Sequence, residues 1–183
     1  MKDIIVGNRV PYEYFVACGV GESDNCTHAG SFHLALADAG IERYNLMTYS
    51  SILPAIATEV EKPIGYVHGS VLETIMARVD GEKSERLTAG IQYGWLIEGE
   101  SEKKYGGLVV EYMGHGTEQE AQVELDEYLK ELYSKADQQR LRLENRRTII
   151  KSVTPSKKYG TTLVALGFVS YVWPVIEGKK GMR

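Results

Sequence analysis

The sequence has little cysteine and no long hydrophobic run. Two cysteines, Cys18 and Cys26, are too few for a disulfide framework, so a reducing cytoplasmic compartment is the expected location. No apolar stretch approaches the roughly 18 residues that a membrane-spanning helix needs. The N-terminal segment is charged and interrupted by glycine and proline, which argues against a signal peptide. We therefore expect neither a disulfide scaffold nor a membrane partner.

The sequence also lacks an excess of basic charge. The formal net charge is −4 and the pI is about 5.6, whereas a nucleic-acid-binding domain usually has a basic face and a high pI. We therefore expect no nucleic-acid partner. The chain has 183 residues, which suits one domain with a sizeable core. Because no repeat, linker or low-complexity segment interrupts it, residues 1–183 are expected to form a single domain.

Common catalytic and cofactor motifs are missing. There is no Walker A pattern, no dinucleotide-binding fingerprint and no G-x-S-x-G motif. The stretch "CGVGES" contains G-x-G but lacks the third glycine and a following helix start. Cys26, His28 and His33 lie close together, but their spacing fits no zinc pattern. We expect no metal site, and a polar loop that leads into a helix is the simpler interpretation.

Local patterns predict an α+β domain. The two helices are separated by a run of strands, which favours an α/β sandwich of mostly antiparallel sheets covered by two main helices. The first strand is expected to end at Gly19 and Gly21. Residues 52–63 are predicted to be a connection. The expected strands cover residues 12–21, 43–51, 65–81, 86–99, 104–114, 146–156 and 161–176, and the expected helices cover 29–40 and 117–140.

The predicted helices carry recognisable end patterns. Gly40 is a suitable residue to follow the first helix. Thr117 and Glu120 form a capping-box pattern at the start of the second. The opposite face of the second helix is charged, so this helix is expected to cover a sheet from outside. Its apolar face comprises Ala121, Leu125, Tyr128, Leu129, Leu132 and Ala136.

Two polar residues in predicted strands each allow two interpretations. Glu111 lies in "GGLVVEYMG" and shares a face with Val109 and Met113 if side chains alternate. It is either an exposed residue at a strand end or a paired, proton-transferring carboxylate, because an unpaired carboxylate is costly in apolar surroundings. Asn45 is either a turn residue after the first helix or part of a site at the following serine pair.

The serine pair lies in "MTYSSILPA", residues 47–55. Adjacent serines usually mark a loop, but Ser51 could also attack the carbonyl of Ser50. The resulting ester, after β-elimination and hydrolysis, would leave a pyruvoyl group at the new N-terminus. This chemistry needs an accessible or strained peptide bond and a donor for the developing oxyanion.

Several of these stretches resemble the pyruvoyl-dependent arginine decarboxylases. The similarity is clearest in "GVGESD", "ALADAGI" and "YNLMTYSSILPA", and "GGLVVEYMG" resembles the segment with the family's catalytic glutamate. The resemblance implies self-cleavage between Ser50 and Ser51 into a β chain (1–50) and an α chain (51–183). Ser51 would become a covalently bound pyruvoyl cofactor, with no metal and no pyridoxal phosphate.

The resemblance also assigns roles to other residues. Asn45 would support self-cleavage, Glu111 would return a proton to the substrate, and Leu36 on the first helix would contact the substrate. The substrate, L-arginine, would form a Schiff base with the pyruvoyl ketone and leave as agmatine and CO₂. The family assembles as a trimer of cleaved protomers, with active sites between neighbours, so a homotrimer is expected.

One position departs from the family. An aspartate that helps to bind the substrate guanidinium is replaced here by His33, and imidazole is a poor partner for guanidinium. Asp38 lies on a different helix face, while Asp24 or Glu22 in the preceding loop, or an acid of a neighbouring subunit, could substitute. Two alternatives therefore stay open: a pyruvoyl-dependent decarboxylase of another amino acid such as histidine, and an uncleaved, non-enzymatic trimeric binding domain.

Overall fold

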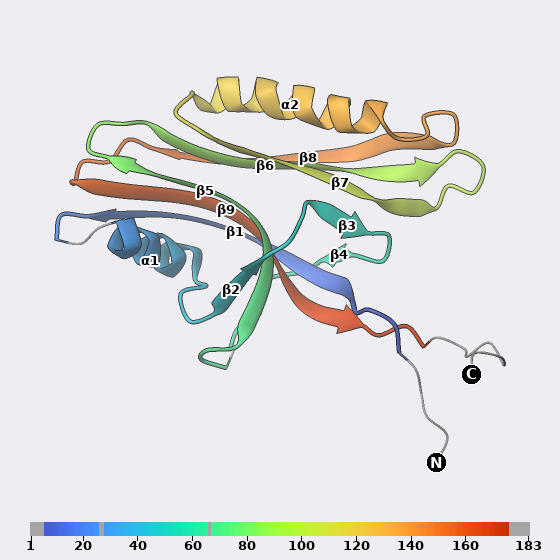
Figure 1. Cartoon of the computed structure of the whole chain (residues 1–183), viewed down its shortest axis with the longest axis horizontal. Helices are drawn as coiled ribbons and strands as arrows, with labels where there is room; N and C mark the ends of the chain where they lie inside the picture. The colour runs from blue at the N-terminus through green and yellow to red at the C-terminus, as the bar shows by residue number, and fades with distance from the viewer. Residues whose placement is uncertain (1–5, 26–27, 66, 176–183) are drawn as a thin grey trace, which may run out of the picture.

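The computed structural model describes residues 6–25, 28–65 and 67–175, and two β-sheets pack face to face in it with a helix on the outer face of each (Figure 1). The five-stranded sheet has the order β2-β5-β9-β1-β4, and the four-stranded sheet has the order β3-β7-β6-β8. Only the β1–β4 and β2–β5 pairs among these strands are parallel. The predicted α+β class, with mostly antiparallel sheets and two helices, is confirmed. In chain order the elements are β1 (Val10–Ser23), α1 (His28–Ala39), β2 (Asn45–Thr48), β3 (Ile52–Pro54), β4 (Thr58–Glu59), β5 (Val71–Glu82), β6 (Leu87–Glu98), β7 (Lys104–Gly114), α2 (Glu118–Ser134), β8 (Leu141–Val153) and β9 (Tyr159–Val172).

The main core lies between the two sheets. Every second side chain of each strand points inward. The inward side chains of the two sheets form one core cluster, in which Ile75, Ile91, Val109 and Leu166 are fully buried. The opposite faces pack against the helices. Strand β9 lies in the middle of its sheet and buries Leu163 on the helix side as well. The last strand is therefore a central strand that is covered on both faces.

Helix α1 ends as the sequence predicts. Gly40 has a φ of 65°, its N–H donates to Ala37 O, and the N–H of Ile41 donates to Leu36 O at 2.9 Å. These two bonds form a Schellman motif, which satisfies carbonyl groups that the helix end leaves free. Ile41 and Leu36 are both buried beneath the helix. The motif therefore fixes α1 on the five-stranded sheet.

Strand β1 runs through Gly19 and Gly21, so the prediction that these glycines end it is wrong. Both face α1, and a Cβ built on Gly19 would lie only 2.0 Å from the backbone oxygen of Ala35. The glycines therefore serve close packing of the helix against the strand. A close approach and a turn both favour glycine, so the sequence alone did not separate them.

Helix α2 begins at the predicted capping box. The Thr117 side chain accepts from the N–H of Glu120, and the Glu120 carboxylate accepts from the N–H of Thr117. Ala121, Leu125 and Leu129 are completely buried against the outer face of the four-stranded sheet. The helix thus covers the sheet from outside, as its charged opposite face indicated (Figure 1).

Several predicted boundaries are wrong. Helix α2 ends at Ser134 rather than residue 140, and β8 begins at Leu141 rather than residue 146. Leu141 and Leu143 alternate with charged residues as in a strand, but the density of charge around them made this two-residue pattern look like the end of a charged helix. The predicted connection 52–63 contains β3 and β4, which are short edge strands and so carry almost no periodic pattern.

Two predictions fall partly on residues outside the description. Cys26 lies outside the described ranges, and so does residue 176 at the end of the last predicted strand. Cys18 is a free, partly buried thiol on β1. No helix in the described ranges combines the length and the apolar character needed to cross a membrane.

The close contact of β1 with α1 gives a stability prediction. Gly19→Ala forces a methyl group against helix backbone, and we expect the free energy of unfolding to fall by about 1–3 kcal/mol. Gly99→Ala is the control, because its nearest neighbour is an arginine side-chain atom at 3.5 Å and the change should stay within about 0.5 kcal/mol. Urea unfolding followed by circular dichroism measures both. Equal stability of the two variants would contradict the packing argument.

Candidate active site

The serine pair lies where the chain passes from one sheet to the other. Strand β2 belongs to the five-stranded sheet and β3 to the four-stranded sheet. The N–H of Tyr49 donates to Thr74 O on β5 at 2.7 Å, and the N–H of Val109 on β7 donates to Ser51 O at 3.2 Å. The peptide bond between Ser50 and Ser51 is therefore held from a different sheet on each side.

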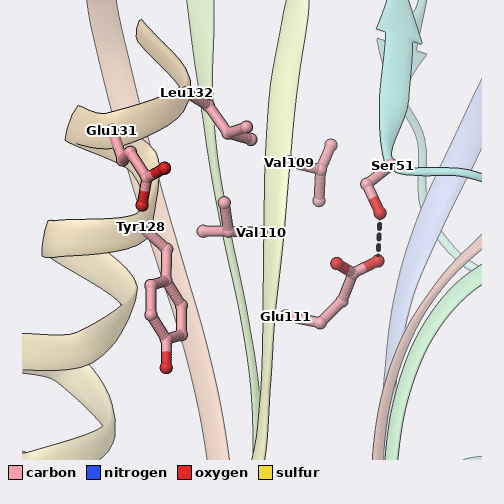
Figure 2. A pocket seen from close by; sticks show the side chains of 7 residues that line it. All are labelled: Ser51, Val109, Val110, Glu111, Tyr128, Glu131 and Leu132. Atoms are coloured by element: carbon pink, nitrogen blue, oxygen red, sulfur yellow. Dashed lines mark hydrogen bonds between the residues drawn. The ribbon is translucent and has the colours of Figure 1, made fainter. Parts of the chain in front are cut away.

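The side chain of Ser51 meets the carboxylate of Glu111. The Ser51 hydroxyl donates a hydrogen bond to Glu111 Oε1 (Figure 2). Glu111 points to the inner face of β7, the same face as the buried Val109, because strand side chains alternate. Glu111 is thus partly buried and hydrogen-bonded rather than exposed at a strand end, and the expected sharing of a face with Val109 is confirmed.

A pocket of about 340 Å³ opens at this edge of the four-stranded sheet. Strand β3 pairs with β7 only at residues 106–108, so the edge of β7 beyond that point has no strand partner on the β3 side. The pocket forms around this free edge. Its lining combines two hydroxyl groups and two carboxylates with apolar side chains: Ser51, Val109, Val110, Glu111, Tyr128, Glu131 and Leu132 (Figure 2).

The backbone at the serine pair forms a tight turn. The N–H of Ile52 donates to the carbonyl oxygen of Ser50 at 2.8 Å, which is the i to i+2 bond of a γ-turn centred on Ser51. Self-cleavage needs a hydrogen-bond donor for the negative charge that develops on the Ser50 oxygen. The backbone N–H of Ile52 is a candidate for this donor. Sequence reasoning did not identify this group, because a backbone amide leaves no residue-type pattern.

Two predicted site residues lie elsewhere in a single chain. The Asn45 side chain donates a hydrogen bond to Gly69 O at 2.7 Å. Gly69 lies in the segment just before β5, so Asn45 is turned away from the serine pair. Leu36 is buried between α1 and the five-stranded sheet and does not line the pocket. Their assigned roles stay predictions, whereas Ser51 and Glu111 come together in the structure.

The acidic residues considered as replacements for His33 have structural partners. His33 itself is exposed on α1. Asp38 accepts from the N–H of Val20, and Glu22 and Asp24 accept from backbone N–H groups of residues 156–158. None of these carboxylates lines the pocket at Ser51.

Sequence reasoning also missed a polar group beside the serine pair. The Tyr49 hydroxyl donates to Glu73 Oε2, and the other oxygen of Glu73 pairs with Arg9. Glu73 is only 1% exposed, on the inner face of β5 with Ile75. A glutamate among the apolar residues of an alternating strand was the available indication.

Comparison with known proteins identifies the family of this chain. The family model for pyruvoyl-dependent arginine decarboxylases matches residues 13–173. A pyruvoyl-dependent arginine decarboxylase of Chlamydia abortus is 30% identical over 189 residues, covering 90% of this chain and 94% of the relative.

Archaeal relatives of the same name are similar as well. One from Methanocella arvoryzae is 38% identical over 116 residues, covering 61% of this chain and 68% of the relative. Another from Archaeoglobus fulgidus is 33% identical over 133 residues, covering 69% of this chain and 81% of the relative. The family match spans both sheets, the serine pair and Glu111, and the chain therefore belongs to the pyruvoyl-dependent arginine decarboxylase family.

Proposed function

We propose that this protein is a self-processing decarboxylase that converts L-arginine to agmatine and CO₂. Membership of the family implies a covalently bound pyruvoyl group and an amino-acid substrate. The observation that carries the proposal is the hydrogen bond from the Ser51 hydroxyl to Glu111 at the edge of the pocket. The relatives described above are all named for arginine, so neither histidine decarboxylation nor an uncleaved binding domain is favoured.

Self-cleavage follows from the groups around the peptide bond. Ser51 Oγ attacks the carbonyl carbon of Ser50 in the orientation that its hydrogen bond to Glu111 gives it, and the hydroxyl proton is passed on to the departing nitrogen. Negative charge develops on the Ser50 oxygen, to which the Ile52 N–H already donates at 2.8 Å. The C–N bond then breaks, the nitrogen takes a proton, and an ester links Ser50 to the Ser51 side chain.

The ester is resolved by elimination. Loss of the Ser51 Cα proton breaks the bond between Cβ and Oγ, so Ser50 leaves as a carboxylate and residue 51 becomes dehydroalanine. One water then replaces the nitrogen, which departs as ammonia. The products are residues 1–50 and residues 51–183, with a ketone at residue 51.

The two products fit the fold as parts of one domain. Strand β1 of the shorter chain pairs along almost its whole length with β9 of the longer chain, and β2 pairs with β5. Beyond the bond, β3 stays paired with β7. These pairings support a single 1–183 domain that stays assembled after cleavage and keeps residue 51 beside Glu111.

The pyruvoyl group supplies a ketone that captures the substrate amine and a carbonyl that accepts the electrons released with CO₂. Glu111 lies beside residue 51, where it can hold the proton that returns to the substrate Cα. Val109, on the same face of β7 as Glu111, gives the pocket an apolar wall that limits water next to the reacting carbon.

The protein is proposed to act in the cytoplasm as a homotrimer. The homotrimer would complete the site. The pocket of one chain is open, and its carboxylates other than Glu111 are limited to Glu131 among the described residues. Met47 and Ile52, on either side of the serine pair, are 53% and 64% exposed. A neighbouring protomer that covers these side chains can contribute the acid for the substrate guanidinium and bring the exposed Asn45 of one chain toward the site of another.

Substrate choice is tested by measuring CO₂ release. The purified protein should release CO₂ from L-arginine at least about 100-fold faster than from L-histidine, because a site that pairs guanidinium rejects a side chain that leaves its carboxylate unpaired. The Ser51→Ala variant should release none. Release from histidine but not arginine would contradict the proposed substrate, and activity of Ser51→Ala would contradict the proposed cofactor.

The role of Glu111 is tested separately. Glu111→Gln should lower kcat for arginine by about 100-fold or more while leaving self-cleavage largely intact, because the amide keeps an acceptor for the Ser51 hydroxyl but donates no acidic proton. Turnover is normalised to the measured amount of pyruvoyl group. Glu131→Gln, in the same pocket on α2, distinguishes loss of the proton donor from a general loss of charge. Near-normal turnover of cleaved Glu111→Gln would remove Glu111 from the role.

A further inference from the structure

The buried carboxylate of Glu73 is hydrogen-bonded to Tyr49, the residue before the serine pair. Glu73 on β5 is only 1% exposed, with one carboxylate oxygen in a hydrogen bond and the other in an ion pair. One accepts from the Tyr49 hydroxyl, and the other pairs with the Arg9 guanidinium. An Arg9–Glu73–Tyr49 connection therefore runs from the start of β1 to the residue next to Ser50.

The surroundings of this connection are aromatic. The Tyr49 ring packs on Phe168 with ring centroids 5.4 Å apart, and the Arg9 guanidinium lies 4.8 Å above the Tyr171 ring. Burial raises the pKa of Tyr171 to about 12, so its hydroxyl stays uncharged near neutral pH. The charge of Glu73 is balanced by the guanidinium of Arg9, with which it forms an ion pair. Aromatic walls and one ion pair together restrict the Tyr49 ring.

Stability alone is a weak reason for such a group. Burying a carboxylate is costly, and well-packed apolar residues often stabilise a protein as well as a buried ion pair does. The position of the group is more informative. Tyr49 is held by its N–H to Thr74, by its hydroxyl to Glu73 and by its ring to Phe168, while Ser51 is held by Val109.

We propose that Tyr49 and Glu73 are positioning residues for self-cleavage. Glu73 fixes the Tyr49 side chain, and Tyr49 fixes the rotation of the peptide units that follow it. The Ser50 carbonyl carbon then stays in front of Ser51 Oγ, with its oxygen on the Ile52 amide. Attack requires this geometry, and holding it in advance removes an entropic part of the barrier. The proposal rests on the proposed self-cleavage.

The protein contains a similar arrangement on the neighbouring strand β6, where Tyr93 pairs with Val109 and not with the segment that is cleaved. The Tyr93 hydroxyl donates to Glu59 Oε2 at 3.0 Å, and Glu59 pairs with Arg147. Tyr93 is 3% exposed in the core between the sheets. Tyr93→Phe removes the same atom from a tyrosine–glutamate–arginine group without changing the segment that is cleaved. It also removes the acceptor of the Tyr14 hydroxyl at 3.3 Å, so it is the more disruptive of the two changes.

The test is the rate of self-cleavage in freshly synthesised precursor, followed by mass spectrometry. Tyr49→Phe keeps the ring and should slow cleavage by about 10-fold or more. Tyr93→Phe should cleave at the wild-type rate. Thermal unfolding of the same variants, each combined with Ser51→Ala to keep the chain whole, reports the stability change separately.

Two substitutions of Glu73 separate positioning from stability. Glu73→Gln keeps an acceptor for the Tyr49 hydroxyl, whereas Glu73→Leu keeps only the volume, and both remove the charge. We expect Glu73→Gln to cleave faster than Glu73→Leu, even if Glu73→Leu unfolds at the higher temperature.

The outcomes are distinct. Wild-type cleavage by Tyr49→Phe, or equal slowing of Tyr49→Phe and Tyr93→Phe in proportion to lost stability, would overturn the positioning role and leave the proposed function standing. Equal rates for Glu73→Gln and Glu73→Leu would also overturn it. A wild-type chain that never cleaves would instead remove the proposed function, and the positioning role with it.

Discussion

The passage of residues 49–51 between two sheets is the constraint on which the site depends. Tyr49 is bonded to β5 and Ser51 to β7, so the segment has little freedom although it belongs to no strand. The brevity of β3 follows from the same crossing, and it leaves the edge of β7 open as a pocket. One topological feature thus holds the peptide bond, exposes it and places it beside Glu111.

The contact between Ser51 and Glu111 can serve two reactions in succession. In the proposed self-cleavage, the carboxylate accepts the hydrogen bond that orients the Ser51 hydroxyl for attack. Once residue 51 carries a ketone, the same carboxylate lies next to the carbon that loses CO₂. The apolar Val109, on the same face of β7, is a neighbour in both stages. A single strand, β7, therefore supplies the carboxylate, the apolar wall and the bond that holds Ser51.

Local patterns predicted the parts of the fold that depend on near neighbours. The capping box at Thr117 and the two-residue alternation around Glu111 are such patterns, and both are confirmed. The short strands β3 and β4 were missed, because their pairing comes from distant residues. Tyr49 and Glu73 were missed for the same reason, since 24 positions separate them in the chain. Asn45 and Leu36 do not reach the serine pair within one chain, because contacts between distant residues hold them elsewhere, and no local pattern indicates such contacts.

The mass of the purified protein after long incubation tests the central claim most directly. We expect two fragments, residues 1–50 and 51–183, with the larger one lighter by one ammonia than a fragment that begins with serine. This mass difference identifies both the cleaved bond and the conversion of Ser51. A single intact chain of 20.4 kDa, or a larger fragment that still begins with serine, would contradict it.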